Sequence, residues 1–226
     1  MIDLLSVQIY IMYNLFHGEV QHGRHIDQVL RDYYPEYNYN GVFLDIGAYE
    51  PINISNSYHF EMNNWSVYCF EANTLLINEL RSKRKNVYNY AIAHENKDNI
   101  QFNVVKGVWG GGSLMAGLSA IELDKEYMNK FQCGIREIIK ITVPQRTLNS
   151  VIEDEIPAIK EIDIMSIDVE GGELNVLKGI DLLKYKPKIL VIENVFNKTD
   201  ILNYLKQFGY ILDKHIDYNQ YYKLIA

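Results

Sequence analysis

Short apolar runs alternate along the chain with stretches in which apolar residues recur at helical spacing. The runs at 162–168 and 187–194 are nearly continuous, as expected where both faces of a parallel sheet are covered. Two closely spaced runs, at 210–216 and 220–225, predict a hairpin that ends the sheet. The pattern therefore predicts an α/β fold, with a mostly parallel sheet of about seven strands and helices on both faces. Further strands are expected at 42–47, 66–71 and 86–91, and helices at 55–62, 73–84, 147–152, from 173 onward, and at 199–207.

The middle of the chain departs from this alternation. Apolar runs at 100–105 and 138–143 enclose a glycine-rich loop and a charged helical stretch at 121–131. This arrangement predicts an inserted hairpin with a flap over about 99–143. Gly110, Gly111 and Gly112 would either hinge a lid or form an ordinary flexible loop.

The first 37 residues predict a helical segment that precedes the core. Leu5, Ile9, Met12 and Phe16 fall at helical spacing, which favours a helix packed on the domain. Polar residues such as Asp3 interrupt the apolar run and no basic residue opens it, so we expect neither a signal peptide nor stable membrane insertion. We expect a single domain over 1–226, with its core at 38–226.

Composition and charge narrow the class of protein. With 226 residues, 48% of them hydrophobic, the chain can bury one ordinary core. A net charge of -7 is the wrong sign for holding a phosphate backbone, so no nucleic-acid partner is expected. Cys69 and Cys133 have no CxxC neighbour, which argues against a disulfide framework and predicts a cytoplasmic, reducing location. The basic run at 81–85 ends a predicted helix, where the dipole favours cations, and we expect it to be solvated.

Acidic residues end several predicted strands. In open α/β sheets ligands bind beyond the carboxyl ends of the strands, where Asp45, Glu71, Asp168 and Glu193 are expected to meet. Any one of them is explained by solvent exposure of a strand end, but four together are explained less well. The loop after the first strand, GAYEPINISNS, lacks the GxGxxG fingerprint, so NAD or ATP is disfavoured. A nucleoside without phosphates fits better, with Glu71 accepting its ribose hydroxyls.

Several of these segments resemble the FkbM family of S-adenosylmethionine-dependent methyltransferases. They are GVFLDIGAYEP, SNSYHFE, CFEAN, RTLNSVI and IDIMSIDVEGGELNVLKGIDLLKYKPKILVIEN. The resemblance implies a Rossmann-like class I methyltransferase fold and S-adenosyl-L-methionine as cofactor. Where other members often have Asn-Asp-Gly, this chain has Tyr49-Glu50-Pro51, which affects the loop that faces the amino-acid end of the cofactor.

The resemblance and the strand-end pattern imply the same cofactor residues. Asp45, Gly47 and Ala48 would line the methionine portion, and Glu71 would bind the ribose. Ala72 and Asn73 would flank the adenine, and residues 91–93 after the third strand would close that side. The full predicted set is Asp45, Gly47, Ala48, Asn56, Glu71, Ala72, Asn73, Ala91 and Ala93.

Methyl transfer to a hydroxyl requires the enzyme to position the oxygen and to assist loss of its proton. Asp168 is the first candidate, as a base or as a metal ligand, and Glu170 and Glu193 are further catalytic candidates. Asp168, Glu193 and Asn194 form an all-oxygen set that resembles the divalent-metal site of catechol-type O-methyltransferases and suits Mg²⁺ or Mn²⁺. Asp168 would alternatively cap a helix, and Glu170 and Glu173 would alternatively satisfy a helix dipole.

The resemblance implies an O-methyltransferase that acts on a hydroxyl of a sugar or glycan. Trp109 and Tyr127 in the expected flap suit stacking on the apolar face of a sugar. A small phenolic or polyketide hydroxyl is the alternative acceptor, and a non-catalytic cofactor-binding module is the alternative class. RNA methylation is disfavoured by the acidic charge.

Overall fold

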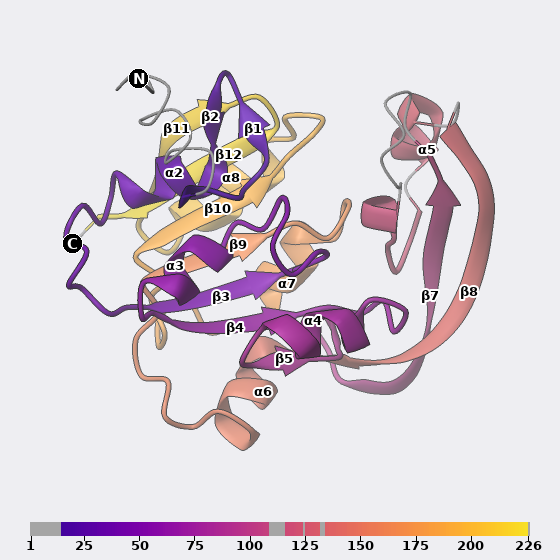
Figure 1. Cartoon of the computed structure of the whole chain (residues 1–226), viewed down its shortest axis with the longest axis horizontal. Coiled ribbons are helices and arrows are strands. Elements are labelled where there is room, and N and C mark those ends of the chain that lie inside the picture. Colours follow the sequence, from indigo (N-terminus) through magenta and orange to yellow (C-terminus); the bar gives the residue numbers. More distant parts are fainter. Residues whose placement is uncertain (1–14, 109–115, 124, 132–133, 226) are drawn as a thin grey trace, which may run out of the picture.

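The computed structural model describes residues 15–108, 116–123, 125–131 and 134–225. Its centre is a seven-stranded sheet in the order β11-β12-β10-β9-β3-β4-β5 (Figure 1). Numbered along the chain, this order is 3-2-1-4-5-7-6, and β12 runs antiparallel to both neighbours while the other pairings along the sheet are parallel. The predicted α/β, Rossmann-like class I methyltransferase fold with its C-terminal antiparallel hairpin is thus confirmed. The strands are β3 (Val42–Ile46), β4 (Ser66–Phe70), β5 (Val87–Tyr88), β9 (Ile164–Ile167), β10 (Ile189–Glu193), β11 (Tyr210–Ile216) and β12 (Asn219–Leu224).

Helices cover both faces of this sheet because its central strands are apolar on both sides. All four residues of β9 are buried, and so are the first four of β10. One core cluster joins α2, α3 and α4 to the sheet, and another joins α6, α7 and α8 to the opposite face. The helices are α2 (Ile26–Arg31), α3 (Tyr58–Met62), α4 (Ile77–Lys83), α6 (Leu148–Asp154), α7 (Glu173–Lys178) and α8 (Asp200–Lys206).

The stretch predicted as one strand at 86–91 is two short strands in different sheets. β5 pairs with β4 in the central sheet, whereas β6 (Ala91–Ile92) pairs with the flap strand β8. Between them Asn89 donates its side-chain amide to the carbonyl oxygens of Glu71 and Ala72. These two bonds hold the crossing point against the end of β4, which explains why the chain leaves the central sheet there.

The predicted hairpin and flap form a second sheet beside the first. β7 (Lys97–Gly107) and β8 (Ile135–Arg146) pair antiparallel, and β6 completes a three-stranded sheet in the order β6-β8-β7. The long hairpin stands at one side of the molecule, with α5 (Lys125–Phe131) near its far end (Figure 1). η1 (Ala116–Leu118) lies closer to the middle of the hairpin, since Ala120 pairs with Asn103 of β7. Trp109, the glycines at 110–112 and the side chain of Tyr127 lie outside the described residues.

The N-terminal segment is only partly a helix where it is described. Residues 1–14, which hold most of the predicted apolar stripe, lie outside the described residues, and Phe16 is buried. A small hairpin, β1 (Val20–Gln21) and β2 (Arg24–His25), then precedes α2. His22 and Gly23 turn it with φ of 46° and 78°, a conformation that a continuous helix does not allow.

Arg84 corrects the prediction that the basic run at 81–85 is solvated. α4 ends at Lys83, and the extended backbone of Arg84 turns its side chain inward, where the residue is only 4% exposed. Its guanidinium pairs with Glu61 and donates to the Pro51 carbonyl and to both the Ser55 and Ser57 hydroxyls. The loop that follows β3 is therefore held from beneath by a buried cation.

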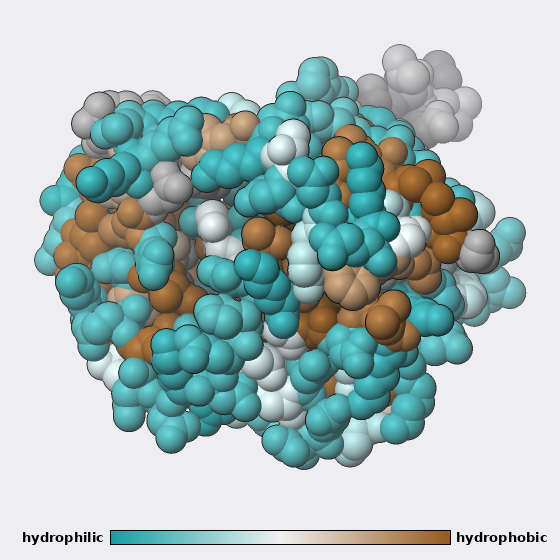
Figure 2. Space-filling model, turned by 180° about the vertical axis from the view of Figure 1, so that it is seen from behind, coloured by the Kyte–Doolittle hydropathy of each residue, from teal (hydrophilic) through white to brown (hydrophobic). Residues whose placement is uncertain are grey.

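Hydrophilic residues cover most of the back of the molecule, and hydrophobic residues show between them in several small patches (Figure 2). The large exposed apolar residues include Met62, Leu75 and Leu183, which come from different elements. Isolated apolar residues of this kind are normal on a globular surface. Within the described residues, no helix has the length and apolar character needed to cross a membrane.

Replacing Arg84 with methionine should lower the free energy of unfolding by about 3–5 kcal/mol, because it leaves the buried Glu61 carboxylate without its partner. Lys83→Met is the matched control, since the Lys83–Glu79 pair is exposed and such pairs contribute at most about 1 kcal/mol. Urea denaturation of both variants measures the difference. Equal losses in the two variants would contradict the structural role of Arg84.

Candidate active site

A cavity of about 910 Å³ lies at the carboxyl ends of the central strands. The flap forms its far wall through β7, η1 and neighbouring residues. All the residues predicted to bind cofactor or to act in catalysis line it, except Asn73. The predicted residues in the wall are Asp45, Gly47, Ala48, Asn56, Glu71, Ala72, Ala91, Ala93, Asp168, Glu170 and Glu193.

Gly47 follows β3, and its backbone lies against the carbonyl group of Asp168, which follows the neighbouring strand β9. Its φ is +86°, a conformation that L side chains rarely adopt, and the Gly47 and Ala48 amides both donate to the Phe70 carbonyl. A Cβ at Gly47 would lie 1.7 Å from the carbonyl oxygen of Asp168. Only glycine therefore lets the loop after β3 pack against the loop after β9.

Glu71 immediately follows β4 and is buried, with 7% of its surface exposed. Its carboxylate accepts the Tyr49 amide at 3.0 Å and the Asn73 amide at 2.7 Å. Burial raises the pKa of Glu71, and these backbone donors oppose that rise. Each carboxylate oxygen has a second lone pair, so Glu71 can still accept hydroxyl donors from a ligand.

Small side chains make an apolar slot next to Glu71. Ala72, Ala91 and Ala93 are buried, and Phe102 of β7 packs in the same cluster as the first two. The short alanine side chains leave space beside the strand ends, and Phe102 borders that space on the flap side. Such a surface suits a planar aromatic ring.

Asp45 lines the cavity, but its carboxylate is bonded within the protein. It accepts the Ser57 hydroxyl, which in turn accepts from Arg84. Burial raises the pKa of Asp45, and the nearby Arg84 charge opposes the rise. Asn56, also predicted to bind cofactor, donates its amide to the Ser166 hydroxyl at 3.1 Å. Both side chains hold the loop after β3 in place.

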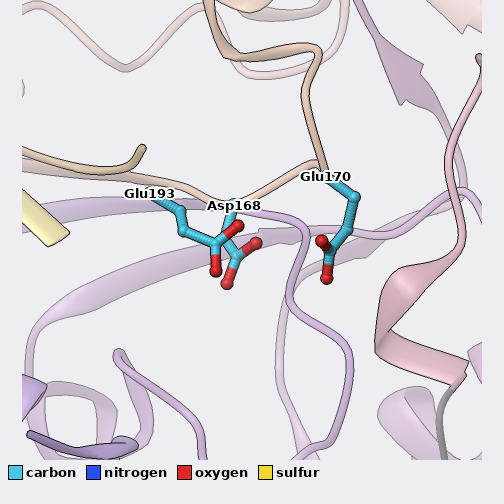
Figure 3. Close-up of side chains that lie close together, drawn as sticks. All are labelled: Asp168, Glu170 and Glu193. Carbon is cyan, nitrogen blue, oxygen red and sulfur yellow. The ribbon is translucent and has the colours of Figure 1, made fainter. Parts of the chain in front are cut away.

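Three carboxylates meet at the other end of the cavity. One oxygen from each of Asp168, Glu170 and Glu193 lies within 4.8 Å of the others. Figure 3 shows the Asp168 and Glu193 carboxylates side by side, with Glu170 reaching down from the loop after β9. Burial, followed by the charges of Glu193 and Glu170, raises the pKa of Asp168 well above its usual range. This group is therefore electrostatically strained unless a proton or another cation joins it.

Asn194, which the sequence predicted as an oxygen ligand beside Asp168 and Glu193, is bonded elsewhere in the structure and does not line the cavity. Its amide donates to the Lys198 carbonyl and to Gln220, and its oxygen accepts the Lys198 amide. Successive side chains on a strand point to opposite faces, so Asn194 turns away where Glu193 faces the cavity. Glu170 supplies the third carboxylate beside those of Asp168 and Glu193. Asn73 likewise lies outside the wall, and its oxygen accepts the Leu75 amide.

The cavity wall also holds residues that the sequence did not single out. Among them, Glu19 comes from the N-terminal hairpin region, Tyr218 from the turn between β11 and β12, and Gln145 from β8. Phe102 was within reach of prediction because it lies in an apolar run of the expected flap. Glu19 had no sequence signal, since a single acidic residue in a polar segment is normally solvated.

The family model of the methyltransferase FkbM domain matches residues 45–212. This chain belongs to the FkbM methyltransferase family. It is thus a methyltransferase, and the family implies S-adenosyl-L-methionine as its cofactor.

No curated protein matches this FkbM-family methyltransferase. Among solved structures, it is similar to the crystal structure of precorrin-6y C5,15-methyltransferase from Geobacter metallireducens GS-15. The two chains are 14% identical, with a TM-score of 0.39, over 92% of this chain and 91% of that one.

Gly47→Ala should weaken binding of S-adenosyl-L-methionine at least about tenfold, because the added Cβ forces the loop after β3 away from Asp168. Gly23→Ala is the control, since Gly23 also has positive φ but no atom within 4 Å of the added carbon. Calorimetric titration with the cofactor measures the effect. Wild-type affinity in Gly47→Ala would show that the close approach is dispensable.

Asp168→Asn should stabilise the protein at neutral pH in EDTA-containing buffer. A carboxyl whose pKa is raised by folding favours the folded state below its unfolded pKa of about 3.9 and loses that contribution as pH rises through the folded pKa. The gain in Asp168→Asn should thus grow from pH 4 upward. Urea denaturation from pH 4 to 8 measures it, with the exposed Asp98→Asn as control. A less stable Asp168→Asn at neutral pH would exclude charge strain.

Proposed function

We propose that this protein transfers a methyl group from S-adenosyl-L-methionine to a hydroxyl of a sugar or glycan. The observation that carries the proposal is one continuous cavity that joins Gly47 and Glu71 to the carboxylates of Asp168, Glu170 and Glu193. The first pair is suited to the cofactor and the second group to a hydroxyl acceptor. Family membership supports the cofactor and the class of reaction.

The residues of the first half match the parts of the cofactor. The backbone at Gly47 and Ala48 can approach the methionine portion closely because no side chain intervenes at Gly47. Glu71 would accept the ribose hydroxyls with its remaining lone pairs. Ala72 and Ala93 would flank the adenine, with Phe102 closing the flap side.

Asp168 is the residue we propose to act on the acceptor. When bound, the cofactor supplies a methyl group on a positively charged sulfur. Asp168 would take the hydroxyl proton while the acceptor oxygen bonds to the methyl carbon and the carbon–sulfur bond breaks. Burial and the charges of the neighbouring carboxylates raise the pKa of Asp168, which makes it a stronger base than an ordinary aspartate. Glu193 and Glu170 would orient the acceptor beside it.

The same three carboxylates would hold a divalent cation. Oxygen ligands from Asp168, Glu170 and Glu193 suit Mg²⁺ or Mn²⁺, and a cation would relieve their mutual repulsion. Bound there, it would acidify the acceptor hydroxyl. We therefore propose a metal set of Asp168, Glu193 and Glu170 in place of one that includes Asn194.

The charge of the cavity favours an acceptor without negative groups. Glu19, Glu50 and Glu122 add to the carboxylates of its wall. Lys97, which also lines the cavity, pairs with Glu95 at 2.6 Å. An RNA backbone or an acidic glycan would be repelled. The flap contributes Leu118, Ile121 and other apolar side chains, which suit the apolar face of a sugar and would also accept a phenolic ring.

The acceptor class is tested by incubating the protein with methyl-labelled cofactor and parallel panels of neutral glycans, phenols and RNA. We expect label in a neutral glycan. Asp168→Asn should lower turnover at least about a hundredfold while cofactor affinity survives, because Asp168 acts on the acceptor. Glu71→Ala should instead weaken cofactor binding.

Each outcome of this experiment decides between the candidates. Label in phenols alone would replace the glycan by the alternative acceptor class, and cofactor binding without label in any panel would favour the non-catalytic module. A fully active Asp168→Asn would exclude Asp168 as the base. Repeating the assay in EDTA and then with added Mg²⁺ or Mn²⁺ tests the cation, since unchanged turnover in EDTA would leave Asp168 to act alone.

A further inference from the structure

The loop between β9 and α7 has an unusual backbone. Glu170 has a φ of +58° and Gly171 a φ of +101°. A left-handed conformation is uncommon for a residue other than glycine and persists only where the surroundings hold it. Glu170 is also the residue whose carboxylate reaches Asp168 and Glu193 (Figure 3). The conformation of this loop thus determines whether the three carboxylates meet.

The Glu173 carboxylate holds this loop. Its Oε1 atom accepts the Gly171 amide at 2.9 Å and the Val169 amide at 3.3 Å. These two amides lie on either side of Glu170, so one oxygen fixes the backbone before and after it. Glu173 is 6% exposed and is not among the residues of the cavity wall. Its side chain is therefore bonded to the loop and does not face the cavity.

We propose that Glu173 is a positioning residue for methyl transfer, which holds the backbone of Glu170 so that its carboxylate joins those of Asp168 and Glu193. This inference rests on the proposed function of the three carboxylates. Glu173 acts through the loop and touches neither acceptor nor cofactor. The Asp168 carbonyl packs against Gly47, so the start of the same loop is already fixed from the cofactor side. Glu173 fixes its remainder.

A simpler role for Glu173 is a negative charge at the start of α7, where the helix dipole favours one. The two roles differ in what they require of the side chain. A charge effect needs a carboxylate near the helix end and tolerates changes of length. Positioning needs an acceptor oxygen at the reach of glutamate and tolerates loss of charge. Glu173→Gln keeps the oxygen and loses the charge, whereas Glu173→Asp keeps the charge and loses the reach.

The experiment compares Glu173→Gln and Glu173→Asp in the full chain, with the acceptor that takes label in the panel assay. We expect kcat of Glu173→Asp to fall about 10–100-fold, with KM for S-adenosyl-L-methionine within about threefold of wild type. Glu173→Gln should keep kcat within about threefold. Melting temperatures of both variants show whether either has lost the fold. A normal kcat in Glu173→Asp, or an equal loss in both variants, would overturn the proposal.

A second measurement needs no acceptor, so it tests whether Glu173 holds the loop even if the proposed function fails. Amide hydrogen exchange at Val169 and Gly171, followed by NMR, reports the two bonds directly. Exchange should accelerate at least about tenfold in Glu173→Asp and stay near wild type in Glu173→Gln, as a tenfold change corresponds to loss of one weak hydrogen bond. Equal exchange rates in wild type and Glu173→Asp would show that Glu173 does not hold the loop.

Discussion

The close approach of the Gly47 backbone to the Asp168 carbonyl is the constraint on which the site depends. β3 and β9 are parallel neighbours at the centre of the sheet, and the Asp168 amide donates to the Ile46 carbonyl at 2.9 Å. The segments that follow β3 and β9 must therefore turn at the same edge of the sheet, where they pack against each other. Because Gly47 has no side chain, the loop suited to the cofactor and the loop that carries Asp168 pack backbone to backbone.

Carboxylates gather in two regions at this edge of the sheet, and the two regions differ in how that negative charge is balanced. Beneath the loop after β3, the buried carboxylates of Asp45 and Glu61 are compensated by Arg84 and the hydroxyl of Ser57. At the end of β9, the carboxylates of Asp168, Glu170 and Glu193 crowd together, and burial together with this crowding raises the pKa of Asp168. The first region stabilises a loop that lacks a glycine-rich cradle. The second concentrates negative charge in the cavity, where perturbed groups commonly act in chemistry.

The flap forms one wall of the cavity and contacts the body of the molecule on both sides of it, near β4 and near β10. Near β4, Phe102 packs with Ala72 and Ala91, and near β10 a separate apolar cluster joins Leu118 to Phe196. Lys130 of α5 lies over the Tyr218 ring at 4.3 Å. The described part of the flap is thus attached to the body of the molecule at two places, one near β4 and one near β10.

The sequence by itself determined the central strands and helices and the positions of the strand-end acids, because hydrophobic periodicity and the FkbM-like segments are local signals. It did not reveal the division of 86–91 between two sheets or the hairpin of β1 and β2. It placed Asp45, Glu71, Asp168 and Glu193 at one edge, since parallel strands share that edge. Only the tertiary structure decided which of these side chains face the cavity. Asn194 points away because strand residues alternate, Arg84 is buried because its backbone is extended beyond α4, and Glu170 joins Asp168 through a backbone conformation that Glu173 stabilises. Arg84 is held by contacts with residues more than twenty positions away in the sequence, and the loop bonds of Glu173 and Asn194 depend on backbone conformations that side-chain patterning does not reveal.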